Sequence, residues 1–256
     1  MKHVSSLSGL TLLELVIAVS LSAVIISAAY KAQLSFSKAA SRENDKAVLQ
    51  RDLMSACDMI EKDIRMAGLG LPGNGVDLKL SDTISDELTL FMNKAQLSAT
   101  LYSNALYTDA KILINRTGIS SWGRWVCLEA AGSIVFKEIT RVGLNLSGDP
   151  DTIYLAAQLN AGLYPQNSNI YSADRISYFL KNMAEKVLCR RFNSRDSEIS
   201  TVIDSLSIVP KDNGGVSLSS GTEAKVLKVV IGGYIGQGGN LVFLAESTEV
   251  NIRNVN

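Results

Sequence analysis

Residues 9–30 read GLTLLELVIAVSLSAVIISAAY, a glycine followed by 21 residues whose only charged side chain is Glu14. As an α-helix, the segment from Leu10 to Tyr30 would extend about 32 Å, close to the roughly 30 Å hydrocarbon core of a bilayer. The run therefore predicts a membrane-spanning helix. A carboxylate at the centre of such a helix costs about 3 kcal/mol, and less near its end, so Glu14 is expected to have a function.

Other apolar amino-terminal segments fit less well. A cleavable secretory signal has a shorter apolar stretch, of about 7–15 residues, before a small-residue site such as 27–29, and it holds no acid. A lipoprotein would need a cysteine near the start, but the first is Cys57. A plain membrane anchor fits the length and leaves Glu14 unexplained.

The junction from Gly9 to Leu15, GLTLLEL, resembles a type IV prepilin leader and cleavage site. The resemblance implies that residues 1–9 are removed by a prepilin peptidase that cuts after Gly9. Leu10 then becomes the N-methylated first residue, and the apolar helix 10–30 remains for subunit assembly. Phenylalanine is commonest at the position of Leu10, so this residue departs from the family pattern.

Cleavage after Gly9 would give Glu14 a partner. The new α-amino group would carry a positive charge at membrane depth, and an acid about 6 Å along the helix can pair with the amine of a neighbouring subunit. Pairing offsets the cost of two buried charges and fixes the axial register between subunits. We therefore expect Glu14 to act in assembly; the alternative is a side chain that merely reaches the membrane interface.

The helix is predicted to continue past the membrane as an amphipathic half, 31–67, because no proline or glycine occurs between Leu10 and Ala67. Its apolar stripe recurs at three- and four-residue steps and should dock a globular domain: Leu49, Leu53, Cys57, Ile60, Ile64 and Ala67. The helix should end at GLGLPGNG, 68–75. This segment matches G-x-G-x-x-G but follows a helix, so it does not predict a dinucleotide site.

The remaining residues, 68–256, predict one β-rich globular domain with a single core. Short β-rich runs alternate with Gly/Asn/Asp turns, which together with the long helix predicts an α+β fold with an antiparallel sheet. The runs are 87–92, 111–115, 125–128, 133–139, 152–156, 175–180, 186–189, 206–209, 225–231, 240–244 and 249–252.

Two further segments resemble PilW-type minor pilins. DLMSACDMIEKDIRMAGLG, 52–70, contains the Asp-Ile-Arg-x-Ala-Gly stretch that closes the family's stalk helix, and RISYFLKNMAEKVLCRR, 175–191, resembles a pair of its strands. The J-type pseudopilins of type II secretion share much of this layout. Most of residues 78–132 has no recognisable match in either family.

The composition argues against catalysis and nucleic-acid binding. The chain has 25 basic and 25 acidic side chains and no basic stripe to meet phosphates. Its one histidine, His3, would leave with the leader, so no Ser-His or Cys-His pair would remain. The carboxylate pairs Asp149/Asp151 and Asp196/Glu198 are expected to lie in solvated turns, and no cofactor or metal site is predicted.

Three cysteines and two tryptophans leave alternatives open. Cys57 lies on the apolar stripe and is expected to be a buried thiol. Cys127 and Cys189 fall in strand-like runs, and either pair as a disulfide or remain two buried thiols. Trp122 and Trp125 should pack against the core, the alternative being an exposed contact for a sugar or a protein.

Together these features predict a minor pilin rather than an enzyme. The resemblance implies a single-pass inner-membrane protein with a periplasmic domain, which reaches the cell surface in a type IV pilus or its priming or tip complex, where it supports adhesion or motility. Its partners would be prepilin peptidase, other minor and major pilins, inner-membrane lipid and the pilus assembly platform. The alternatives are a pseudopilin of a type II secretion system and, more distantly, a membrane-anchored periplasmic enzyme.

Overall fold

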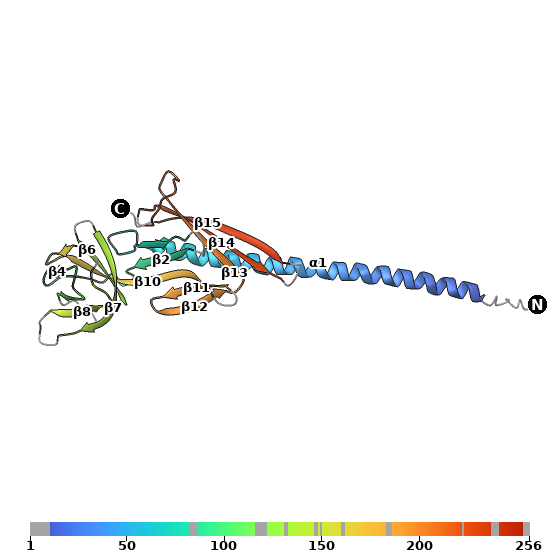
Figure 1. Cartoon of the computed structure of the whole chain (residues 1–256), viewed down its shortest axis with the longest axis horizontal. Helices are drawn as coiled ribbons and strands as arrows, with labels where there is room; N and C mark the ends of the chain where they lie inside the picture. Colours follow the sequence, from blue (N-terminus) through green and yellow to red (C-terminus); the bar gives the residue numbers. More distant parts are fainter. Residues whose placement is uncertain are drawn as a thin grey trace, which may run out of the picture.

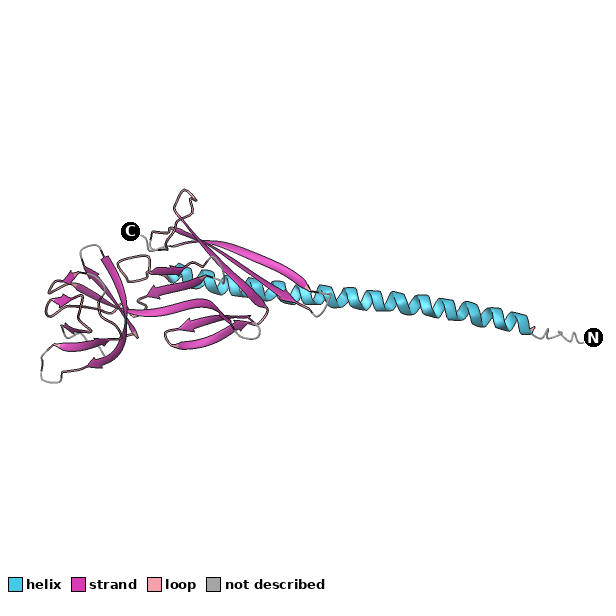
Figure 2. Ribbon diagram, viewed as in Figure 1, coloured by secondary structure: helices cyan, strands magenta, loops and turns pink. Residues whose placement is uncertain are grey.

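A single helix, α1 (Leu12–Met66), forms a long stalk whose second half carries a strand-rich domain (Figures 1 and 2). The computed structural model describes residues 11–81, 86–115, 122–130, 133–145, 148, 150–159, 162–182, 186–221, 223–236 and 241–252. The first half of α1 projects away from the domain (Figure 1). The predicted layout of a long apolar helix followed by an antiparallel sheet domain is confirmed.

Local hydrogen bonds and backbone geometry determine where α1 begins and ends. Thr11 is the N-cap, and its side chain accepts a hydrogen bond from the backbone of Glu14. At the other end, the Ala67 N–H bonds to the Ile64 carbonyl, and Gly68 adopts a φ of +71°. A side chain at Gly68 would collide with the backbone of Gly73, so glycine is required where the chain leaves the helix.

Within the described residues the strands pair antiparallel in three sheets. The largest has ten strands, in the path β1-β2-β10-β6-β7-β8-β5, to which β11, β12 and β3 are added. The second sheet has the order β13-β14-β15, and the third pairs β4 with β9. The strands are β1 Val76–Lys79, β2 Glu87–Met92, β3 Ser98–Thr100, β4 Ala105–Leu106, β5 Lys111–Ile114, β6 Trp125–Ala130, β7 Ser133–Gly143, β8 Asp151–Leu155, β9 Leu163–Tyr164, β10 Asn169–Asn182, β11 Lys186–Phe192, β12 Arg195–Ser200, β13 Ile203–Lys211, β14 Val226–Ile235 and β15 Val242–Asn251.

Two hydrophobic cores divide the domain, where the sequence predicted one. The proximal core packs the buried stripe of α1 against β1, β2, β10, β11 and the three-stranded sheet. The distal core is formed by residues between Ala99 and Ile170, at the end of the molecule far from the free half of α1 (Figure 1). Strand β10 joins them, because its first residues pair with β3 and β6 and its later residues pair with β2 and β11.

The structure corrects the strand prediction in several places. The short strands β1, β3, β4 and β9 were not predicted, and two longer segments differ from the prediction. The runs 240–244 and 249–252 belong to one strand, β15, which pairs with β14 from Val242 to Asn251; Asn240 itself lies outside the described residues. The charged segment Arg195–Ser200, predicted as a turn, is strand β12. It pairs with β11 as an edge strand, and its polar side chains suit that position because they face solvent.

Candidate functional site

Glu14 lies in the first turn of α1 and closes a capping box with Thr11. Its Oε2 accepts hydrogen bonds from the Thr11 backbone N–H and from the Thr11 hydroxyl, both at 3.1 Å, while the Glu14 N–H donates to Thr11 Oγ1 at 3.3 Å. The helix dipole favours a carboxylate at this end. The T-x-x-E spacing is itself a capping signal, and it gives Glu14 a local role that the assembly hypothesis did not include.

The helix after Glu14 is apolar and exposed, and its serine hydroxyls form hydrogen bonds within the helix. It is a candidate membrane span, with a mean hydropathy of 2.4 over its most apolar window and none of that window buried within the domain. The hydroxyls of Ser20, Ser22 and Ser27 each donate to the carbonyl four residues earlier at 2.8 Å. These side chains therefore need no water, which suits a helix surrounded by lipid.

The predicted cleavage and methylation residues, Gly9 and Leu10, lie outside the described residues. Of the predicted assembly set, the structure therefore places only Glu14, at the amino-terminal end of the stalk. The proposed roles of Gly9 and Leu10 remain predictions from sequence.

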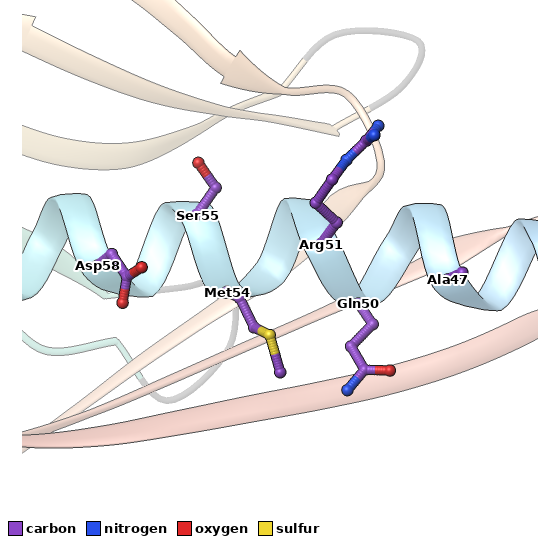
Figure 3. Close-up of a pocket in the computed structure, with 6 residues that line it drawn as sticks. All are labelled: Ala47, Gln50, Arg51, Met54, Ser55 and Asp58. Carbon is purple, nitrogen blue, oxygen red and sulfur yellow. The ribbon is translucent and has the colours of Figure 1, made fainter.

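The second half of α1 has a docked face and a free face. Leu49, Leu53 and Ile60 are buried in the proximal core, as the apolar stripe predicted. The opposite face carries exposed residues that line a shallow hollow along the helix (Figure 3): Ala47, Gln50, Arg51, Met54, Ser55 and Asp58. The helix is therefore covered by its own domain on one side only.

A buried polar cluster fixes the docked face. Asp63 of α1 accepts hydrogen bonds through Oδ2 from the Tyr178 hydroxyl at 2.6 Å and from Arg190 Nε at 2.8 Å. Asp63 and Tyr178 are buried, and the Arg190 side chain is 24% exposed. Burial, together with the hydrogen bond to Asp63, holds the pKa of Tyr178 well above its ordinary value.

Sequence reasoning missed this cluster as a unit, although it quoted the two segments that supply it. Asp63 occupies a position on the apolar stripe, between Ile60 and Ile64, and an acid there signals a buried partner. Tyr178 on β10 and Arg190 on β11 lie directly opposite each other in the strand register, so one carboxylate meets both.

Of the two alternatives for Cys127 and Cys189, a disulfide or two buried thiols, the structure has the buried thiols. Cys57 is also a buried free thiol. Cys127 lies opposite Tyr171 of β10, and Cys189 lies opposite Phe179 of the same strand. Eight residues of strand separate those positions by about 26 Å, whereas the Cα atoms of a disulfide lie within about 7 Å.

The tryptophans are half-buried, in line with the packing prediction. Trp122 packs against the distal core. The ring of Trp125 lies edge-on to Phe91, with centroids 5.5 Å apart, and the guanidinium of Arg175 lies 4.9 Å from the Trp125 centroid. The two tryptophans therefore belong to the framework of the domain rather than to an exposed aromatic pair.

The expectation of solvated turns is wrong for at least one carboxylate of each pair, because Asp151 is buried and Asp196 lies on a strand. Asp151 begins β8 and accepts a hydrogen bond from the Asn145 backbone N–H. Asp196 lies on β12, and Arg191 forms an ion pair with it that lowers the pKa of its carboxyl. Asp149 lies outside the described residues. Within the part of the chain that the structure describes, no group of three or more metal-ligating side chains comes together.

Comparison with known proteins returns no relative. No family model, curated protein or solved structure matches the chain.

Proposed function

We propose that this chain is a minor pilin, processed by prepilin peptidase after Gly9 and incorporated into a type IV pilus or its priming or tip complex. The observation that carries the proposal is a lone acid, Glu14, at the start of an exposed apolar helix of membrane length, preceded by glycine. The one-sided docking of the second half of α1 supports it, because a subunit that assembles through its helix needs a free helical surface.

In this proposal the apolar half of α1 spans the inner membrane with the strand-rich domain in the periplasm. Cleavage creates an amine on Leu10, and the Glu14 carboxylate of a neighbouring subunit neutralises it. An unpaired buried charge costs roughly 3–5 kcal/mol, which corresponds to more than about a hundredfold in an association equilibrium. This cost favours association with a subunit that offers the complementary charge.

The capping box offers a competing structural role for Glu14, and two variants separate it from the charge role. Glu14→Gln keeps an oxygen that can accept from Thr11 and removes the charge, whereas Thr11→Ala removes the cap and keeps the charge. If pairing of charges drives assembly, Glu14→Gln is processed but absent from surface filaments, and Thr11→Ala is incorporated. Incorporation of Glu14→Gln at the wild-type level would refute the charge role.

Mass spectrometry of the mature amino terminus tests the class of protein. N-methyl-Leu10 is expected. An intact leader, or a cut near Ala29, would contradict the proposal.

A further inference from the structure

Strand β15 forms an open edge of the three-stranded sheet. Among the described strands it pairs with β14 alone, and the register between Val242 and Asn251 runs without a shift. At about 3.4 Å per residue this straight edge is roughly 30 Å long. Its sequence contains neither proline nor lysine, which commonly protect edge strands. An unpaired strand edge presents a row of backbone donors and acceptors, so it can bind another extended chain.

The hydrogen-bond pattern shows which backbone groups of β15 face outward. The Ile252 N–H donates to the Lys225 carbonyl at 2.9 Å, and these two residues continue the register of β15 with β14. In an antiparallel ladder every second residue exchanges hydrogen bonds with the neighbouring strand, and the residues between them point their N–H and C=O groups the other way. Within the described residues, these outward groups form no other hydrogen bond. They belong to Phe243, Ala245, Ser247, Glu249 and Asn251.

The stalk helix covers one face of this sheet and leaves the edge free. On the face toward α1, the Thr248 hydroxyl donates to Glu61 Oε2 at 3.3 Å, and Val250 is buried in the proximal core. The side chains that alternate with these are exposed on the opposite face. Strand β15 runs lengthwise beside α1 (Figure 1), so its edge is parallel to the stalk.

Two other edges of the domain are protected against pairing. The outer edge of β13 is capped by Asp86, whose N–H donates to the Leu206 carbonyl and whose Oδ2 accepts from the Ile208 N–H. The edge strand β12 carries exposed charges, at Arg195, Asp196 and Glu198. Strand β15 has no such cap, and of its two acids Glu249 already pairs with Lys211 at 2.6 Å. Because edges are normally protected in one of these ways, an open edge of this length indicates a binding surface.

The other acid, Glu246, favours a basic residue on the bound chain. Its side chain is half-buried on the side of β15 that faces α1. Burial raises the pKa of Cys57, and the negative charges of Glu246, Asp58 and Glu61 raise it further, so these acids surround that thiol. Among the described residues only Glu61 has an ion-pair partner, Arg65. A lysine or arginine opposite Glu246 would supply the missing charge.

We propose that β15 is the docking edge for an extended segment of a different protein, which adds to the sheet as a fourth, antiparallel strand. The outward N–H and C=O groups of residues 243–251 form its hydrogen bonds. Antiparallel pairing is the more stable arrangement per residue. A basic side chain lies opposite Glu246, and an aromatic or β-branched side chain lies opposite Phe243, because such pairs stabilise neighbouring strands.

A second copy of this chain does not fit the edge. Copies whose helices cross one membrane in the same direction have their β15 strands in the same direction, so two β15 edges cannot pair antiparallel. This step rests on the proposed function, which places α1 in the membrane. The other edges of the chain do not complement β15 either, because β12 is charged, β13 is capped, and β1 and β5 are short.

Hydrogen exchange of single amides tests the edge in the detergent-solubilised full chain. Without a partner, the amides of Ala245, Ser247 and Glu249 should exchange at least about a hundredfold faster than those between them, which bond to β14. The probe is a capped peptide as long as residues 243–251. It alternates threonine and valine, with lysine opposite Glu246 and tyrosine opposite Phe243. When bound, it should slow the outward amides about tenfold or more and leave the inward amides unchanged.

Modified peptides separate strand pairing from other binding. Methylation of the peptide amides that face β15 should abolish the protection, because a methylated amide donates no hydrogen bond. Methylation of the alternate amides is the matched control and should preserve it. Glutamate in place of the peptide's lysine should weaken binding about fivefold, and Glu246→Gln in the chain should remove this preference.

Variants of the chain test the same edge from the other side. Ser247→Pro removes an outward N–H and leaves the ladder with β14 intact, so it should keep the urea midpoint of the wild type and bind the peptide at least about tenfold more weakly. Ser247→Ala keeps the N–H and should bind as the wild type does. If Ser247→Pro fails to fold, the methylated peptides decide the question.

Two results would overturn the proposal. Equal protection by the two methylated peptides, or none by the unmodified peptide, refutes the docking edge. Protection of the outward amides without peptide, increasing with the concentration of the chain, assigns the edge to a second copy. Neither result changes the mass of the mature amino terminus, so the proposed function is tested separately by the detection of N-methyl-Leu10.

Discussion

Removal of Asp63 should loosen the domain from its stalk. In the native chain the Asp63 carboxylate accepts from the Tyr178 hydroxyl and from Arg190 Nε. Asp63→Ala leaves both donors without that acceptor. Breaking a buried ion pair costs about 3–5 kcal/mol. Because the Arg190 side chain is 24% exposed, water screens part of the loss, and we expect about 2–4 kcal/mol.

The measurement is urea unfolding of the detergent-solubilised full chain, followed by tryptophan fluorescence. Trp125 is a suitable reporter because it contacts Phe91 and Arg175, from the strands that carry the proximal core. Asp58→Ala is the matched control, since Asp58 is an exposed acid on the same helix; it should change the free energy of unfolding by less than about 0.5 kcal/mol.

Two further variants show how much each interaction of Asp63 contributes to the stability lost in Asp63→Ala. Tyr178→Phe removes the hydroxyl that donates to Asp63 Oδ2 and accepts from Arg190 Nε, and it keeps the ion pair between Asp63 and Arg190, so it should cost about 1–2 kcal/mol. Replacing both charges with apolar groups, Asp63→Leu with Arg190→Met, should restore most of the stability, because no unpaired charge remains buried. The reasoning is refuted if Asp63→Ala costs no more than Asp58→Ala.

Burial and backbone geometry give three other predictions. Burial raises the pKa of Cys57 to about 11 and of Cys127 to about 12, so maleimide should label the native chain at least about a hundredfold more slowly than a free cysteine; rapid labelling would show exposure. These thiols and Tyr178 have raised pKa values in the folded chain, so the stability that they contribute is complete below about pH 9 and falls as the pH rises through about 11. Urea unfolding midpoints measured across that pH range check this. Midpoints that do not change with pH would contradict it. Gly75 and Gly162 have φ values of +64° and +66°, but only at Gly75 would a Cβ collide with backbone atoms. Gly75→Ala should therefore cost about 3 kcal/mol or more, and Gly162→Ala about 1 kcal/mol. Equal unfolding midpoints for the two variants would contradict the predicted collision.

Much of the fold could be predicted because it depends on local patterns. An unbroken stretch without proline or glycine predicts the helix, and Gly68 ends it. Alternating apolar residues between turn signals located most of the long strands. The short strands β1, β3, β4 and β9 were missed because two to four residues are too few to give a clear pattern, and β12 is an edge strand whose polar composition resembles a turn.

The candidate site, like the fold, was predicted from the sequence only in part. Glu14 was identified because an acid in an apolar run is conspicuous. Its capping partner Thr11 was not identified, although the T-x-x-E spacing is a signal that could have shown it. The hollow that Lys38 and Arg42 of α1 form with Tyr234 of the three-stranded sheet was not predicted, because about 190 residues of sequence separate its two sides, which come together only when the sheet folds back along α1.

The sequence by itself determined the stalk: its length, its apolar first half, its docking stripe and its lone acid. These properties follow from residue type and a period of 3.6, which act over a few neighbouring residues. Only the tertiary structure decided what the stripe meets. Strand register brings Tyr178 and Arg190 to Asp63, keeps Cys127 and Cys189 apart and divides the core in two. Register depends on contacts between distant segments, because a strand's pattern fixes the face of each side chain without fixing its partner.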